Sequence, residues 1–133
     1  MSGTLKKIMI VDDSPSIIKF LEMVLGKERY AVISYGNGLD AVDSVEEESP
    51  DLIVMDMNMP KLGGIDAART IKQNIKTSHI PIIIISGHDQ EEEVRKAREA
   101  GADDFLVKPY APEQLLEIIK EKIERADRNL RDT

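Results

Sequence analysis

The sequence has no cysteine and no tryptophan among its 133 residues, and aromatic residues make up only 4 % of it. The lack of cysteine excludes disulfides and thiolate metal sites, and it suits a reducing compartment such as the cytoplasm, where we expect the protein to act. Its uninterrupted apolar runs, such as residues 82–85, are far shorter than the roughly 20 residues that a membrane-spanning helix needs.

The chain also has too little positive charge to bind polyanions. Its formal net charge is −7, which repels both nucleic acid and anionic membranes, so we expect neither as a direct partner. The same acidity favours solubility. A chain of 133 residues is the size of one domain, and it is long enough to bury a core without disulfides or a structural metal.

Five short apolar runs alternate with stretches in which apolar residues recur at helical spacing. Runs of this length with few polar positions are typical of strands that are buried on both faces of a parallel sheet. The alternation therefore predicts an α/β fold of the (βα)5 type, with a five-stranded parallel sheet and helices on both faces. The expected strands are residues 8–11, 30–35, 52–55, 82–85 and 105–107.

The stretches between these runs carry signals for the starts and ends of helices. Ser14-Pro15 combines an N-cap with proline at the first helical position, and Pro112 opens the last helix. Gly101 stands where a left-handed C-cap would end the fourth helix, and residues 63–64, both glycine, are expected to make a tight turn. The expected apolar faces are Leu39, Val42 and Val45 in the second helix, Ile65, Ala68, Ile71 and Ile75 in the third, and Leu115, Ile119 and Ile123 in the fifth.

Polar side chains follow four of the five expected strands. Asp12 and Asp13 come after the first strand, Asp56 after the third, Ser86 after the fourth and Lys108 after the fifth. In an open parallel sheet, ligands bind at the carboxyl ends of the strands. The sequence therefore gathers three carboxylates, a hydroxyl and an ammonium group at one crevice, which suits a divalent cation and a phosphoryl group.

The chemistry of this group of side chains can be assigned by residue type. A carboxylate can attack phosphorus and form an acyl phosphate, and Asp56 is the central candidate. Mg²⁺ prefers oxygen ligands, so we expect Asp13 and Asp56 to bind it directly and Asp12 directly or through water. Lys108 and Ser86 can then contact oxygens of the attached phosphoryl group.

Together these motifs resemble the response regulator receiver domain of two-component signalling, the CheY-like family. The likeness covers residues 6–125, and residues 126–133 form a charged C-terminal tail or the end of a helix. The resemblance implies a flavodoxin-like sheet with strand order 2-1-3-4-5. It is carried by Asp12-Asp13, by Asp56 within the segment 56–60, by Ser86-Gly87 and by Lys108-Pro109, a peptide bond that is cis in relatives.

The resemblance also implies roles for particular residues. The backbone carbonyl of Asn58 would complete the Mg²⁺ site, in which Mn²⁺ can substitute. Asn58 and His88 match positions that tune the lifetime of the phosphoryl group, although His88 could equally be a solvated loop residue. Phe105 matches an aromatic residue that changes rotamer together with Ser86, although it could equally be an ordinary core residue.

The function implied is that of a signalling switch and not of a metabolic enzyme. Asp56 would take a phosphoryl group from a sensor histidine kinase or a phosphotransfer protein. The face formed by the fourth helix, the fifth strand and the fifth helix would then change and control an output protein. Neither the kinase nor the output protein follows from the sequence, which also leaves open a phosphorylation-dependent dimer.

Two alternative functions share part of this pattern. A haloacid-dehalogenase-like, Mg²⁺-dependent phosphatase also uses an aspartate nucleophile, but it needs a second aspartate two residues later, where this chain has Asn58. Its metal-binding pair also follows the nucleophile, whereas Asp12-Asp13 precede Asp56. A flavodoxin-like cofactor binder needs a phosphate-binding loop after the first strand, and the two aspartates there would repel a flavin phosphate.

Overall fold

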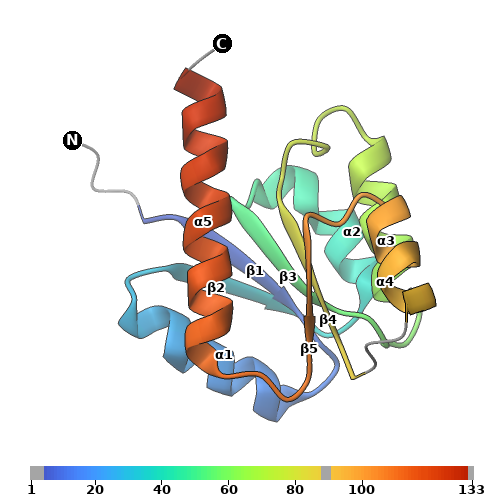
Figure 1. Cartoon of the computed structure of the whole chain (residues 1–133), viewed down its shortest axis with the longest axis horizontal. Helices are drawn as coiled ribbons and strands as arrows, with labels where there is room; N and C mark the ends of the chain where they lie inside the picture. The colour runs from blue at the N-terminus through green and yellow to red at the C-terminus, as the bar shows by residue number, and fades with distance from the viewer. Residues whose placement is uncertain (1–4, 88–90, 132–133) are drawn as a thin grey trace.

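The protein is described by a computed structural model that covers residues 5–87 and 91–131. Strands and helices alternate strictly along these residues (Figure 1). None of the helices among them is long and apolar enough to cross a membrane. The elements are β1 (Lys7–Val11), α1 (Pro15–Lys27), β2 (Ala31–Tyr35), α2 (Gly38–Glu48), β3 (Leu52–Asp56), α3 (Gly64–Gln73), β4 (Ile82–Ser86), α4 (Glu91–Glu99), β5 (Asp104–Val107) and α5 (Pro112–Arg131).

The five strands form one parallel sheet in the order β2-β1-β3-β4-β5. Helices α1 and α5 cover one face of the sheet, and α2, α3 and α4 cover the other (Figure 1). Because all strands run in the same direction, their carboxyl ends share one edge of the sheet. The expected fold class, strand order and two-sided helical cover are confirmed.

The core consists of two apolar layers, one on each side of the sheet. Successive strand residues point to opposite faces, so Met9 and Val11 pack with α2, α3 and α4, while Ile8 and Ile10 pack with α1 and α5. The expected inner face of the last helix is confirmed, since Leu115, Ile119 and Ile123 are all buried in the second layer.

Two residues of the expected helical faces lie elsewhere. Leu39 is 45 % exposed, and the buried positions of α2 include Ala41 and Val45, which lie four residues apart on the side that faces the sheet. Leu39 precedes Ala41 by two residues, about half a helical turn away from that side. Ile75 is 89 % exposed because α3 ends at Gln73 and the backbone of the next residue is extended.

Helix α5 continues to Arg131, so the charged stretch that begins at Glu124 is helical in the structure. Asp127 in this stretch accepts a hydrogen bond of 3.0 Å from the ammonium group of Lys6, just before β1. The placement of the domain limits at residues 6–125 stays a prediction.

The loop after β3 bends at a residue that the sequence does not indicate. Lys61, and not residue 63 or 64, has a positive φ of 69°, next to a short contact from the amide of Leu62 to the carbonyl of Pro60. Gly64 is needed for a different reason: a Cβ atom there would lie 2.3 Å from the carbonyl oxygen of Asp56. The absence of a side chain therefore lets α3 begin directly against the end of β3.

Candidate functional site

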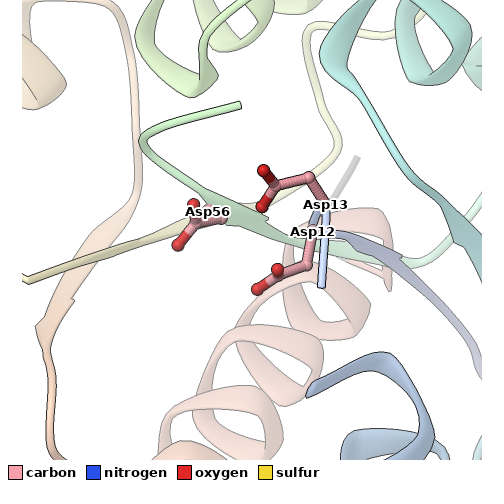
Figure 2. Close-up of side chains that lie close together, drawn as sticks. All are labelled: Asp12, Asp13 and Asp56. Atoms are coloured by element: carbon pink, nitrogen blue, oxygen red, sulfur yellow. The ribbon is translucent and has the colours of Figure 1, made fainter. Parts of the chain in front are cut away.

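Three carboxylates meet at the carboxyl edge of the sheet. Asp12 and Asp13 directly follow β1, and Asp56 is the last residue of the neighbouring β3. Figure 2 shows the three side chains gathered together, with those of Asp12 and Asp13 directed to the side where Asp56 lies. One oxygen atom from each carboxylate lies within 4.8 Å of the other two, which is close enough to ligate one metal ion.

Burial makes this cluster electrostatically costly. Asp12 and Asp56 are 6 % and 7 % exposed, whereas Asp13 is open to solvent. Burial raises the pKa of Asp12, and the charges of Asp56 and Asp13 raise it further, although the amide of Ser14 and the charge of Lys108 act in the opposite direction. A cation placed between the three carboxylates would relieve this repulsion.

Lys108 supplies the positive charge on the other side of Asp56. Its ammonium group lies 2.9 Å from Asp56 Oδ1, and the backbone amide of Asn58 donates to Asp56 Oδ2 over 3.2 Å. Burial lowers the pKa of Lys108, but its hydrogen bond to Asp56 and the charges of Asp56 and Asp12 outweigh burial, so the net shift is upward. Lys108 therefore stays an ammonium ion at neutral pH.

Ser86 lies at the end of β4, next to the site. Its side chain is buried, and its carbonyl accepts a hydrogen bond of 2.7 Å from the amide of Lys108. In the sheet register, Asp56 pairs with Ile85, so Ser86 lies one residue beyond the partner of Asp56. The peptide bond between Lys108 and Pro109 is cis, as the resemblance implied.

The remaining expected site residues are Asn58, Phe105 and His88. Asn58 is exposed in the loop after β3. Phe105 is half-buried in β5 and packs against the layer formed with α2, α3 and α4, beside a cavity of about 330 Å³ whose lining includes Val94 and Ala97. His88 lies outside the described residues, so its expected role stays a prediction.

Sequence reasoning missed an apolar cavity beside the carboxylates. It has a volume of about 300 Å³, and Asp56 and Lys108 line it together with Ile17, Phe20 and Tyr110. Phe20 is 43 % exposed. The only sequence signal for this cavity is that Phe20 is an apolar residue outside the buried side of α1, which includes Leu21 and Leu25. Burial raises the pKa of the Tyr110 hydroxyl, with a further rise from the charges of Asp12 and Asp56 and an opposing effect of Lys108.

Comparison with known families agrees with this geometry. A sequence model of the family described as "Response regulator receiver domain" matches residues 8–120, which is most of the chain. The chain belongs to this family. It is therefore a receiver domain of two-component systems, and the phosphatase alternative is not supported.

Individual relatives include a protein of similar length and a longer one. The chain is 40 % identical to Protein PilH of Pseudomonas aeruginosa over 113 residues, which are 85 % of this chain and 93 % of PilH. It is 35 % identical over 122 residues to the alkaline phosphatase synthesis transcriptional regulatory protein PhoP of Bacillus subtilis. That match covers 92 % of this chain but 50 % of PhoP, so the chain spans about half the length of this curated relative.

A solved receiver domain of similar structure holds magnesium. It belongs to the sensor histidine kinase PA1611 of Pseudomonas aeruginosa PAO1, and its crystal structure has a magnesium ion coordinated in the active site cleft. The two chains superpose with a TM-score of 0.84 and are 29 % identical, over 91 % of this chain and 99 % of the other.

Proposed function

We propose that Asp56 accepts a phosphoryl group from a sensor histidine kinase or a phosphotransfer protein. The observation that carries this proposal is the position of its carboxylate. Asp56 lies within 4.8 Å of two other carboxylates on one side and 2.9 Å from an ammonium group on the other. An acceptor needs this combination, because the transferred group carries negative charge that must be matched by cations.

The donor set fits Mg²⁺. The three carboxylates offer hard oxygen ligands, and burial, together with the charges of Asp56 and Asp13, raises the pKa of Asp12 when no cation is present. We assign Asp12, Asp13 and Asp56 as the residues that hold the ion, with the backbone carbonyl of Asn58 as a further ligand suggested by the family. When bound, Mg²⁺ neutralises part of the charge on the transferred phosphoryl group; Mn²⁺, which favours similar ligands, can take its place.

Transfer needs few groups from the chain itself. A carboxylate oxygen of Asp56 forms a bond to phosphorus while the bond from phosphorus to the donor nitrogen breaks, and the electron pair of that bond stays on nitrogen. The ammonium group of Lys108, already beside the carboxylate, pairs with an oxygen of the arriving group. The hydroxyl of Ser86 donates to another of these oxygens once the group is attached. The chain thus catalyses only its own phosphorylation and dephosphorylation.

The output surface in this proposal is formed by α4, β5 and α5. Helix α4 buries only Ala97 among its residues Glu91–Glu99, so a small displacement of this helix exposes little apolar area. Ser86 at the end of β4 and Phe105 in the adjacent β5 connect the site to this surface, since Ile84 of β4 is paired with Phe105. A partner that binds the altered surface would read the phosphorylation state.

The test is chemical labelling of the purified chain by acetyl phosphate. We expect one acid-labile phosphate per chain with Mg²⁺ present, none with excess chelator, and none in Asp56→Asn, which keeps the shape of the side chain but lacks the nucleophile. A matched Asp66→Asn variant, which alters an exposed aspartate on α3, should label normally. Labelling of Asp56→Asn, or labelling that a chelator does not affect, would refute the assignment; rapid turnover of a phosphate ester would favour a phosphatase.

A further inference from the structure

Another cavity, with several polar side chains in its lining, lies at the opposite end of the sheet from the carboxylates. Its volume is about 360 Å³, and it is formed where the C-terminal half of α5 passes the segments that lead into β4 and β5. Figure 1 shows this part of α5 projecting beyond the sheet at the end where the strands begin. The volume falls within the range of small-molecule sites. Polar side chains in its lining are His79, Asp103, Lys122, Arg125 and Asn129.

The most informative of these residues is Lys122. Its side chain is only 11 % exposed, yet its ammonium group lies 3.5 Å from the Asp104 carboxylate and 3.9 Å from that of Glu121. It donates no hydrogen bond to any residue that the structure describes. No buried side-chain nitrogen among the described residues lacks a hydrogen-bond partner, so this ammonium group reaches solvent and can donate to a ligand in the cavity.

A neighbouring lysine, Lys72, has a partner for each of its three N–H donors. Lys72 is 16 % exposed, and its ammonium group lies 2.8 Å from Asp103 Oδ2, 2.7 Å from the carbonyl of Ile80 and 3.2 Å from that of Ser78. Asp103 Oδ2 also accepts a hydrogen bond of 2.8 Å from the amide of Ile82. The carboxylate in the cavity lining is therefore already neutralised by Lys72 and does not serve Lys122.

Three other polar groups of the cavity lining could also contact a ligand. The guanidinium of Arg125 is 58 % exposed and lies 3.7 Å from Glu121, its ion-pair partner. Among the residues that the structure describes, neither His79 nor Asn129 makes a side-chain hydrogen bond. The cavity thus presents two cationic groups, an imidazole and an amide in a chain whose net charge is −7.

We propose that this cavity binds a small organic phosphate of nucleotide size. Its phosphate would meet Lys122 and Arg125 through charge-assisted hydrogen bonds. Its flat apolar body would lie against Pro81 and Ala126, which also line the cavity, with the planar groups of His79 and Arg125 available for stacking. This site is independent of the phosphoryl group at Asp56.

The experiment is residue-resolved amide NMR of the full chain, without Mg²⁺ and with chelator, titrated with adenosine 5′-monophosphate. Inorganic phosphate and adenosine are titrated in parallel as the anion without the body and the body without the anion. We expect saturable shifts at residues 79–82, 103–104 and 122–129 with the nucleotide, and binding at least tenfold weaker with either half alone. Arg125→Gln and Lys122→Gln should each weaken nucleotide binding about tenfold, the usual effect of losing one hydrogen bond to a charged group.

Arg128→Gln is the matched control, because Arg128 is an exposed residue of the same helix outside the cavity lining and its loss changes the net charge equally. The proposal would be overturned if the nucleotide caused no amide shifts, or if its shifts mapped to the carboxyl edge of the sheet. It would also be overturned if Arg128→Gln weakened nucleotide binding as much as Arg125→Gln does. The exposed position of Arg125 keeps the test valid if Lys122→Gln disturbs folding.

Discussion

Replacing Gly64 by alanine tests how the chain positions the carboxylate of Asp56. The added Cβ would lie 2.3 Å from the carbonyl oxygen of Asp56 and 3.0 Å from the Cα atom of Met57. Both are backbone atoms, which cannot rotate away, so either α3 or the end of β3 must move. Overpacking of this kind costs about 1–3 kcal/mol of the free energy of unfolding. The displaced carboxylate should also weaken Mg²⁺ binding.

Gly26→Ala is the control with the opposite expected sign. Gly26 lies in α1, and a Cβ atom there would have no atom within 4 Å. Alanine is the better helix former, so this variant should gain about 0.5–1 kcal/mol. Urea unfolding measures both changes as shifts of the midpoint at constant slope, and a Mg²⁺ titration measures the effect on the site. Equal stability and equal Mg²⁺ affinity of the two variants would refute the reasoning.

Three further predictions concern other parts of the molecule. Lys72→Met should lower the free energy of unfolding by about 1–3 kcal/mol in urea melts, because it leaves the Asp103 carboxylate without its cation and two carbonyl groups without the lysine donor. Arg69→Met, which breaks an exposed ion pair, should change the free energy of unfolding by less than about 0.5 kcal/mol. The pKa of Asp12 is raised in the fold above its ordinary 3.8. Without Mg²⁺, the chain should therefore lose stability as the pH rises from 3.8 through the raised pKa, because the unfolded chain releases this proton at lower pH than the folded chain does. Asp12→Asn should remove this loss and be the more stable chain at pH 7. Ser86→Ala should still be phosphorylated, but beryllofluoride with Mg²⁺ should give less than half the wild-type amide shifts in α4 and α5.

Each of these predictions has an outcome that contradicts it. Equal costs for Lys72→Met and Arg69→Met would mean that the buried network contributes nothing. A metal-free wild-type chain as stable at pH 7 as Asp12→Asn would mean that burial and the neighbouring carboxylates do not measurably disfavour the charge of Asp12. Full-sized shifts in Ser86→Ala would mean that the signal reaches the distant surface by another route.

The parts that sequence reasoning predicted well are those governed by local patterns. The runs at residues 52–55 and 82–85 are buried strands because every position is apolar, and the polar residues that follow them meet at one edge because parallel strands end on the same side. Asp12, Asp13 and Asp56 could thus be grouped before any coordinates were known. The strand order came from the resemblance to a family, since the pattern of runs alone does not specify it.

The parts that it missed depend on contacts between distant segments. Helical spacing alone placed Leu39 and Ile75 on buried faces, but burial depends on which side of a helix meets the sheet and on where the helix ends. Gly64 was predicted to be a turn residue. Its actual role follows from the closeness of α3 to the backbone of β3, which the sequence does not show. The contrast between Lys72 and Lys122 is equally invisible in the sequence, where both are single lysines on amphipathic helices.

The central claim, that Asp56 is the acceptor, is tested most directly by locating the phosphoryl group on the chain. Borohydride reduces an aspartyl phosphate to homoserine, which peptide mass spectrometry can place in the sequence. After treatment with acetyl phosphate and Mg²⁺, we predict homoserine at position 56 and at no other position. Homoserine at position 12 or 13, or a phosphoryl group that survives acid and lies on a serine, would contradict the assignment of Asp56.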